Sequence, residues 1–366
     1  MRILATADTV GGVWVYALEL ARALAPHGVE VALATMGAPP SADQRRELAT
    51  LDNVELHEST FRLEWMQDPW LDVDRAGDWL LALEQRVRPD VVHLNGFVHG
   101  ALPWTAPVLV VGHSCVRSWW QGVYGRTPPS EWDEYTTRVR AGLASADLVA
   151  APSHAMLRAL VRHYGSFVDT DVIPNGRDGT RFRPGHKESL IFAAGRLWDE
   201  AKNVAALCRV AQSLPWPAYV AGSKRSPDGA EPDVEHVHAL GVLPANELAE
   251  WLGRASIYAF PARYEPFGLS VLEAALSGCT LVLGGIESLR EIWGDAAAYV
   301  DPMDDDQLAR TLQWMCDDAS LRRALAARAR TRALELTPAL MAERYLAAYN
   351  RLRHAHMNGE VAACAS

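Results

Sequence analysis

One stretch begins with a charged loop and continues into an apolar helix: Arg263-Tyr264-Glu265-Pro266-Phe267-Gly268-Leu269-Ser270-Val271-Leu272-Glu273-Ala274-Ala275. Proline disfavours the helical conformation in the residue before it, so Pro266 predicts that Glu265 lies in the loop ahead of the helix. Gly268 allows the backbone to approach a ligand closely where the helix begins. The N–H groups at that end lack partners within the helix and the helix dipole is positive there, which favours a bound phosphate.

Two carboxylates flank this helix start. Glu265 precedes it, and Glu273 lies roughly one and a half turns into the helix at about 3.6 residues per turn. The pattern suits a ligand that carries phosphate in its middle and hydroxyl-rich groups at both ends. A nucleotide sugar is such a ligand.

Strand and helix patterns alternate along the 366 residues, a length that favours two domains. Several expected strands are continuous apolar runs, such as residues 108–111, which is typical of parallel strands buried on both faces. In the first half we expect strands at 2–7, 29–35, 53–57, 90–94, 107–112, 147–151 and 171–173, and helices at 13–26, 74–88, 131–145 and 153–163. After turn-forming residues at 174–188 we expect strands at 190–194, 218–221, 256–260, 280–283 and 298–300, and helices at 203–213, 245–254, 268–277 and 304–317.

This alternation predicts an α/β protein with two Rossmann-like, doubly wound domains. We expect a first domain at 1–174, a linker at 175–188, a second domain at 189–337, a final helix at 338–354 and a frayed tail at 355–366. Ligands of open α/β sheets bind beyond the carboxyl ends of the strands, so a cleft between the two domains is the expected site.

Composition excludes several classes of protein. The formal net charge of −10 argues against a nucleic-acid-binding protein. Five scattered cysteines without C-x-x-C spacing predict neither disulfides nor a zinc site and favour a reducing, cytoplasmic setting.

The sequence predicts neither a membrane span nor a metal site. The chain begins directly with a strand pattern, so we expect no signal peptide. No apolar run reaches the roughly 18 residues of a membrane span, so only peripheral membrane contact stays open. Asp72-Val73-Asp74 matches a D-x-D metal motif, but its polar, irregular context indicates a chance match, and we expect no metal.

Other candidate residues follow expected strands. Gly11 and Gly12 follow the first strand and favour close approach of N–H groups to a phosphate or sugar, although a tight turn explains them equally well. His113 ends the strand at 107–112, where it should face the cleft, although a lone histidine is more often structural. Arg196 and Lys202 follow the strand at 190–194 and could neutralise a diphosphate, or could simply pair with Asp199 and Glu200.

Aromatic side chains gather directly after His113. Trp119, Trp120 and Tyr124 are acceptor-side candidates because aromatic faces stack on sugars, although packing within the protein is the commoner use of such residues.

The seven-residue spacing of Glu265 and Glu273 around Pro-Phe-Gly-Leu resembles the E-x7-E signature of retaining glycosyltransferases of the GT-B fold, family 4 type. The run from Gly195 to Lys202 is similar to the G-R-L-x-x-x-K pattern of that family, with one additional residue before the lysine. The match extends over both halves of the chain, because the glycine loop at 11–12, His113 and the segment at 241–244 also have counterparts in the family.

The resemblance implies transfer of a sugar from a UDP-, GDP- or ADP-linked donor to an unidentified acceptor hydroxyl, with no metal or other cofactor. It implies that Glu265 stabilises the reacting sugar, that Arg196 and Lys202 stabilise the leaving diphosphate, and that His113 lies near the reaction centre. Glu273 would bind the ribose, and the last helix would cross back to the first domain. The remaining donor contacts would come from Gly11, Gly12, Val242, Leu243, Phe267, Gly268, Leu269 and Ser270.

Two other functions stay open. A nucleotide-sugar epimerase or hydrolase of the same fold would need no acceptor, so product analysis separates it from a transferase. A non-catalytic sugar-nucleotide-binding protein is the second, but it would not need to keep two cations for a diphosphate.

Overall fold

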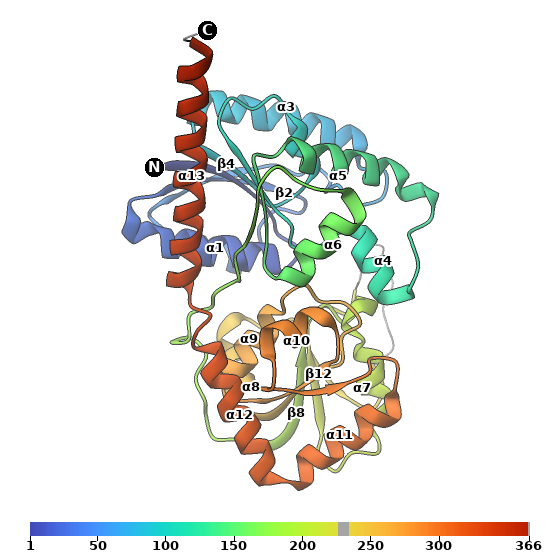
Figure 1. Ribbon diagram of the computed structural model, residues 1–366. Helices are drawn as coiled ribbons and strands as arrows, with labels where there is room; N and C mark the ends of the chain where they lie inside the picture. The colour runs from blue at the N-terminus through green and yellow to red at the C-terminus, as the bar shows by residue number, and fades with distance from the viewer. Residues whose placement is uncertain (226–233, 365–366) are drawn as a thin grey trace. The chain divides into compact units, whose positions relative to one another are not determined.

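The computed structural model describes residues 1–225 and 234–364, which form two compact units. The first unit contains residues 1–118, 126–176 and the C-terminal segment from Pro338. The second contains residues 177–337 together with the short segment 119–125. Both units are built on a parallel sheet flanked by helices, as the sequence predicts (Figure 1).

The first sheet has seven parallel strands in the order β3-β2-β1-β4-β5-β6-β7. Its central strands are apolar and buried on both faces, which explains their continuous apolar runs. The strands are β1 (Arg2–Asp8), β2 (Glu30–Met36), β3 (Val54–Glu58), β4 (Val91–Leu94), β5 (Val108–Val111), β6 (Leu148–Ala151) and β7 (Thr170–Val172).

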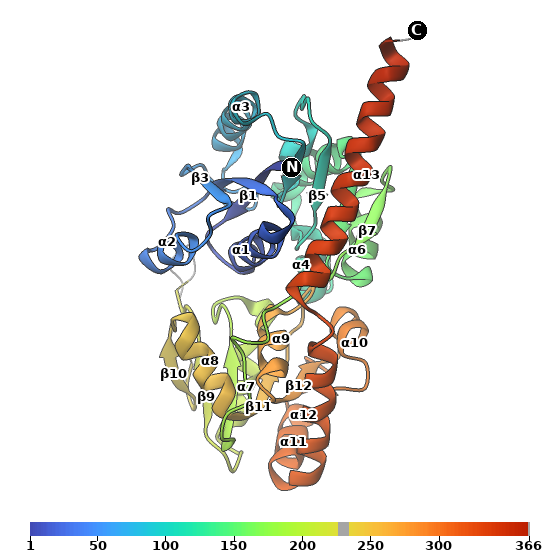
Figure 2. The same cartoon turned by 90° about the vertical axis from the view of Figure 1, so that its left-hand side faces the viewer.

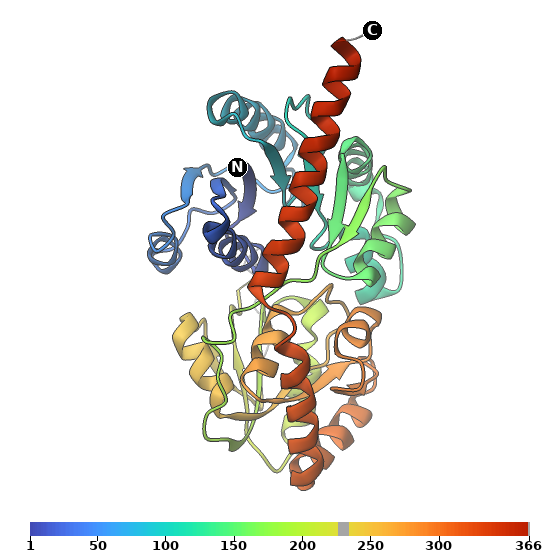
Figure 3. The same cartoon turned by 60° about the vertical axis from the view of Figure 1, so that its left-hand side comes forward.

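Helices cover both faces of this sheet. Helices α3 and α5 pack on one face, and α1 and α13 lie side by side on the other (Figure 2, Figure 3). The α-helices are α1 (Gly12–Leu24), α2 (Ala42–Leu48), α3 (Trp70–Val87), α4 (Val116–Tyr124), α5 (Asp133–Ser145), α6 (His154–Tyr164) and α13 (Pro338–Cys364), and the short 3-10 helices are η1 (Ala25–His27), η2 (Val98–Ala101) and η3 (Ser130–Trp132).

The second sheet has six parallel strands in the order β10-β9-β8-β11-β12-β13. Helices α8, α9 and α12 pack on one face, and α7 and α11 on the other. The strands are β8 (Glu188–Ala194), β9 (Ala218–Ala221), β10 (His238–Gly241), β11 (Ala255–Phe260), β12 (Thr280–Gly284) and β13 (Ala298–Val300). The helices are η4 (Glu200–Lys202), α7 (Val204–Ala211), α8 (Ala245–Arg254), α9 (Leu269–Leu276), α10 (Glu287–Trp293), α11 (Asp305–Asp317) and α12 (Ala319–Ala333).

The structure corrects some expected elements. The expected tail from residue 355 is helical, because α13 continues to Cys364. Helices α2, α4 and α10 and strand β10 were not expected, and α4 contains the aromatic residues Trp119, Trp120 and Tyr124. In the portion of the chain that the structure describes, none of the helices combines the length and the apolar character needed to cross a bilayer.

Candidate active site

The strand order of the second sheet changes direction beside β8. Strand β8 lies between β9 and β11, and all three are parallel, so the loops after β8 and β11 leave the same edge of the sheet. Such a switch point is where open α/β sheets bind ligands. The loop after β8 carries Arg196 and Lys202, and the loop after β11 carries Glu265.

The loop after β11 holds Glu265 directly ahead of α9. Gly268 is the N-cap residue of that helix and has a φ of 90°, a left-handed conformation that glycine adopts without steric cost. Oε1 of Glu265 accepts from the N–H of Phe267 at 3.3 Å, and the backbone carbonyl of Glu265 accepts from the hydroxyl of Ser288 in α10. The carboxylate is thus held in the loop, and the helix start that follows it carries the predicted donor contacts Phe267, Gly268, Leu269 and Ser270.

Lys202 reaches this carboxylate from the neighbouring loop. Its Nζ lies 2.8 Å from Oε2 of Glu265, and the two side chains are only 13% and 15% exposed. Lys202 ends the single 3-10 turn η4, which follows Arg196 in this loop. The carbonyl of Ala201 in that turn accepts from the N–H of Arg263, which joins the two loops.

Arg196 has a carboxylate partner within its own loop. Its Nη2 donates to Oδ2 of Asp199 at 2.7 Å, the pairing that we considered as the alternative to a diphosphate-binding role. Burial alone raises the pKa of Asp199, but the charges of Lys202 and Arg196 outweigh it, so the pKa lies below its usual value. Glu200, in contrast, pairs with neither cation: Lys202 turns to Glu265 instead.

Glu273 is held by Arg177, a residue that no motif of the sequence indicated as part of the site. Its Oε1 lies 2.7 Å from Nε of Arg177, and the two residues are 5% and 6% exposed. Arg177 directly follows the Pro174-Asn175-Gly176 turn that opens the linker. Nothing in the local pattern relates positions 96 residues apart, so only the fold could bring them together.

The aromatic segment 119–124 lies beside the same loop of the second unit. Trp119 donates through Nε1 to Oδ1 of Asp199 at 3.1 Å, and the hydroxyl of Tyr124 donates to Glu200 at 2.9 Å. The rings of Trp119, Trp120 and Tyr124 form one cluster with centroid distances of 4.8 to 6.1 Å. The structure therefore brings these three residues close to Arg196, although they follow His113 in the sequence.

Val242 and Leu243, the other predicted donor contacts in the second unit, follow β10 and precede α8. Val242 is 74% exposed, which is unusual for a valine and leaves its side chain available to a ligand.

In the first unit the predicted residues follow neighbouring strands at one edge of the sheet. Gly11 is the N-cap residue of α1 and Gly12 is its first residue, directly after β1. His113 follows β5, and Asn95, which no motif of the sequence indicated, follows the intervening strand β4. Nε2 of His113 lies 2.8 Å from Oδ1 of Asn95.

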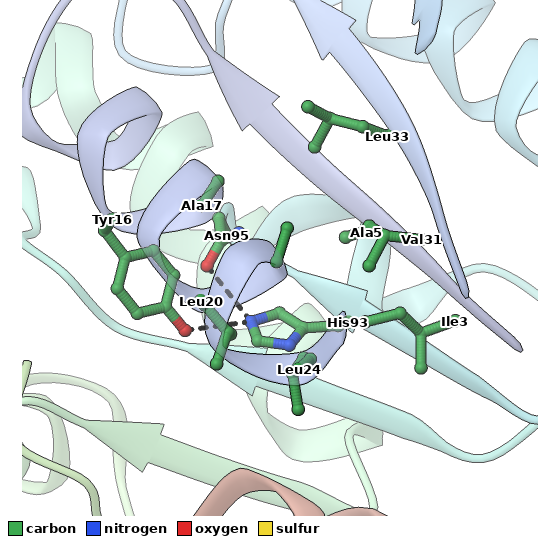
Figure 4. A pocket seen from close by; sticks show the side chains of 11 residues that line it. Ile3, Ala5, Tyr16, Ala17, Leu20, Leu24, Val31, Leu33, His93 and Asn95 are labelled. Carbon is green, nitrogen blue, oxygen red and sulfur yellow. Dashed lines mark hydrogen bonds between the residues drawn. The ribbon is translucent and has the colours of Figure 1, made fainter. Parts of the chain in front are cut away.

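The pKa of His113 is lowered from its ordinary value to about 3 by burial of the ring and by the neighbouring His93. The ring is therefore neutral at physiological pH. A small pocket of the same unit lies next to this network, between α1 and the strands that it covers, and His93, Asn95 and Tyr16 contribute to its lining (Figure 4).

The described part of the chain contains no group of three His, Cys, Asp or Glu side chains that could hold a metal ion. The two carboxylates of the D-x-D match lie on α3. Asp72 accepts from the N–H of Arg62 at 3.1 Å, and Asp74 pairs with Arg138 at 2.6 Å.

Comparisons with known proteins agree with this architecture. Residues 10–181 match the family model "Glycosyltransferase Family 4", and residues 188–318 match "Glycosyl transferases group 1". Glycogen synthase of Mycobacterium tuberculosis is 28% identical over 359 residues, covering 88% of this chain and 86% of that protein.

Two solved structures show the same fold. Sucrose-phosphate synthase from Thermosynechococcus elongatus superposes with a TM-score of 0.80 at 18% identity, covering 97% of this chain and all of that one. Anabaena Alr3699/HepE in complex with UDP-glucose gives a TM-score of 0.73 at 16% identity and covers 96% of this chain and 100% of its own. With two Rossmann-like units and one glycosyltransferase model matching each half, the chain belongs to the GT-B glycosyltransferases.

Proposed function

We propose that this glycosyltransferase moves a hexose from a nucleotide-diphosphate donor to an acceptor hydroxyl, with retention of anomeric configuration and without a metal ion. The observation that carries the proposal is the Lys202–Glu265 pair ahead of helix α9, with Arg196 in the adjoining loop. It combines a carboxylate, two cations and free helix N–H groups at one edge of the second sheet. The UDP-glucose complex of Anabaena Alr3699/HepE, which has the same fold, supports a nucleotide sugar as donor.

Each group has a role that its charge suits. The N–H groups at the start of α9 and the cations Arg196 and Lys202 would bind the diphosphate and stabilise the charge that develops as it leaves. Glu265 would accept hydrogen bonds from the sugar hydroxyls and stabilise the positive charge at the reacting carbon. Glu273, oriented by Arg177, would bind the ribose.

In the reaction the bond between the anomeric carbon and the phosphate oxygen breaks, and a bond from that carbon to the acceptor oxygen forms on the same face. The leaving diphosphate takes the bond's electron pair and then the acceptor's proton, so the step needs no other base. The reducing setting that suits the free cysteines Cys115, Cys208, Cys279 and Cys316 agrees with a cytoplasmic enzyme.

The first experiment identifies the donor and then tests the roles. A thermal-shift screen over UDP-, GDP- and ADP-sugars selects the donor, and product NMR with candidate acceptors reports the anomeric configuration. We expect Arg196→Ala and Glu265→Gln each to lower single-turnover rates by about 10²-fold or more. Arg209→Ala is the control, because Arg209 is also a half-exposed arginine paired with a carboxylate, Asp305, and has no part in the site.

Near-normal rates in both site variants would contradict the assigned roles. Inverted product would contradict retention, and loss of activity with a chelator that returns when a metal is added would contradict metal independence. Release of free or epimerised sugar without any acceptor requirement would favour a hydrolase or an epimerase.

A further inference from the structure

The side chain of Asn95 has only one orientation that satisfies its neighbours. Its Nδ2 lies 2.7 Å from the backbone carbonyl oxygen of Thr6. The backbone N–H of Asn95 donates to the hydroxyl of Thr6 at 2.9 Å. A carbonyl oxygen can only accept, so the amide NH₂ group must face Thr6. Oδ1 of Asn95 therefore points the other way, toward two histidine rings.

The nearer ring is that of His113. Its Nε2 is 2.8 Å from Oδ1 of Asn95, which is an acceptor, so Nε2 must carry a proton. With a pKa of about 3 the ring is neutral and holds a single N–H proton. That proton is on Nε2, and Nδ1 consequently keeps its lone pair.

The second ring, His93, continues the same network. Its Nε2 lies 3.3 Å from Oδ1 of Asn95 and 3.2 Å from the hydroxyl of Tyr16 (Figure 4). If this Nε2 carried no proton, its lone pair would face a lone pair of Oδ1 of Asn95. We therefore place the proton of His93 on Nε2. The pKa of His93 is lowered to about 4, mainly by burial, so this ring is neutral as well.

The network ends on the C-terminal helix. Because Nε2 of His93 carries the proton, Nδ1 accepts, and its partner is the hydroxyl of Tyr349 in α13 at 2.7 Å. The hydroxyl of Tyr16 is in turn hydrogen-bonded to Tyr345 of the same helix. A continuous set of hydrogen bonds thus runs from α13 through His93 and Asn95 to His113.

We propose that Asn95, supported by His93 and Tyr349, is a positioning residue that holds His113 in the Nε2–H tautomer and presents Nδ1 as a hydrogen-bond acceptor. His113 then acts on a substrate hydroxyl by accepting its hydrogen bond, and it does not serve as an acid. The part that His113 plays in turnover rests on the proposed function, whereas its tautomer does not.

The tautomer is measured directly in the full chain. Long-range ¹H–¹⁵N spectra of protein labelled at histidine nitrogen distinguish the two neutral tautomers, and His113→Asn and His93→Asn assign the two rings. We expect both rings to be neutral and protonated on Nε2 at pH 7. A proton on Nδ1 of His113, or a positively charged ring, would overturn the proposal without any functional assay.

Asn95→Ser tests the positioning, because serine is too short to reach either ring. We expect His113 to become a mixture of tautomers and kcat to fall about tenfold, as for loss of one hydrogen bond, while the KM for the donor changes less than about threefold. His99, whose Nε2 lies 2.9 Å from the carbonyl of Val73 outside this network, is the internal control and should keep its tautomer. An unchanged His113 tautomer in Asn95→Ser would overturn the proposal.

Tyr349→Phe tests the link to α13. It removes only the hydroxyl that donates to His93, so we expect His93 to become a mixture of tautomers while Asn95 keeps His113 protonated on Nε2. A His93 tautomer that does not change would remove α13 from the network. Tyr299→Phe is the control, because it also removes a hydrogen-bonded tyrosine hydroxyl, one that donates to the backbone carbonyl of Leu289 in the second unit, outside this network.

The two proposals fail separately. Full activity of His113→Asn, together with the expected tautomer shift in Asn95→Ser, would remove His113 from the reaction and leave its positioning by Asn95 intact. If His113→Asn loses turnover as expected but Asn95→Ser leaves the His113 tautomer unchanged, His113 keeps its part in the reaction and Asn95 is not what positions it.

Discussion

Arg177 and Glu273 lie 96 positions apart and form an ion pair of 2.7 Å in which both side chains are more than nine-tenths buried. The pair joins Arg177, where the long segment 177–337 of the second unit begins, to the middle of α9, the helix that begins beside Glu265. The guanidinium of Arg177 also lies over the ring of Phe182, 5.2 Å from its centroid. The interaction thus connects the beginning of the linker to the helix that carries the predicted donor contacts.

Removing one partner of this pair should strongly destabilise the second unit. Arg177→Ala leaves the carboxylate of Glu273 buried without its cation, and we expect a loss of about 3–5 kcal/mol in the free energy of unfolding. The double variant with Arg177→Met and Glu273→Gln removes both charges, and we expect it to lose clearly less free energy of unfolding than Arg177→Ala does. Urea denaturation measures all three proteins; equal losses in the single and double variants would show that packing rather than charge explains the effect.

The Lys202–Glu265 pair should behave as a coupled unit. Both groups are mostly buried and lie 2.8 Å apart, so a double-mutant cycle with Lys202→Met and Glu265→Gln should give a coupling energy of about 1–2 kcal/mol in stability. The same cycle on the surface pair Arg254–Glu188, 2.7 Å long with side chains 45% and 42% exposed, should give less than about 1 kcal/mol. Equal coupling in both cycles would contradict a special environment at Glu265.

Stability should fall as pH falls below about 6.5, the ordinary pKa of histidine. The folded state lowers the pKa of His113 to about 3 and that of His93 to about 4, so the unfolded chain takes up protons that the folded chain does not. Their contribution to stability is complete above the unfolded-state pKa and is lost as pH falls toward the folded-state values.

His113→Asn should therefore reduce the slope of unfolding free energy against pH by about 1.4 kcal/mol per pH unit between pH 5 and 6. Urea titrations at a series of pH values measure the slope. Above pH 7.5 the slopes of the variant and the wild type should coincide, because the histidine is then neutral in both states. Parallel curves throughout would show that His113 titrates normally in the folded protein.

The sequence predicted the central strands well because strands buried on both faces are continuous apolar runs. Val108 to Val111 is such a run, and it forms β5 with no residue more than 4% exposed. Helix α2 was missed for the opposite reason: none of its residues is buried, so it has no apolar periodicity to detect. Its only local signal is the capping box at Ser41 and Gln44.

The parts of the candidate site that depend on local backbone conformation were predictable from the sequence. Pro266 and Gly268 indicated the loop and the helix start around Glu265, and the structure has both. The partners of the site residues were not predictable, because they depend on which strands are neighbours. Asn95 reaches His113 only because β4 lies next to β5.

Gly122 should be essential for the contact between the aromatic segment and the loop ahead of Glu265. A Cβ at this position would lie 2.8 Å from Cβ of Tyr264 and 3.2 Å from the carbonyl oxygen of Arg263, which is closer than packed atoms approach. Gly122→Ala must therefore move the segment or the loop. We expect a stability loss of about 1–3 kcal/mol, typical of overpacking, together with slower turnover because Glu265 follows directly in that loop.

The matched control is Gln121→Ala, an exposed neighbour in the same helix, which should change neither stability nor rate. Since Trp119 donates to Asp199, the displacement should also alter tryptophan fluorescence in Gly122→Ala. Trp119→Phe combined with Gly122→Ala should lose most of that fluorescence change, which assigns it to Trp119 rather than to a neighbouring indole. Wild-type stability and turnover in Gly122→Ala would mean that the segment can leave the loop without consequence, and it would then have no part in holding Glu265 in place.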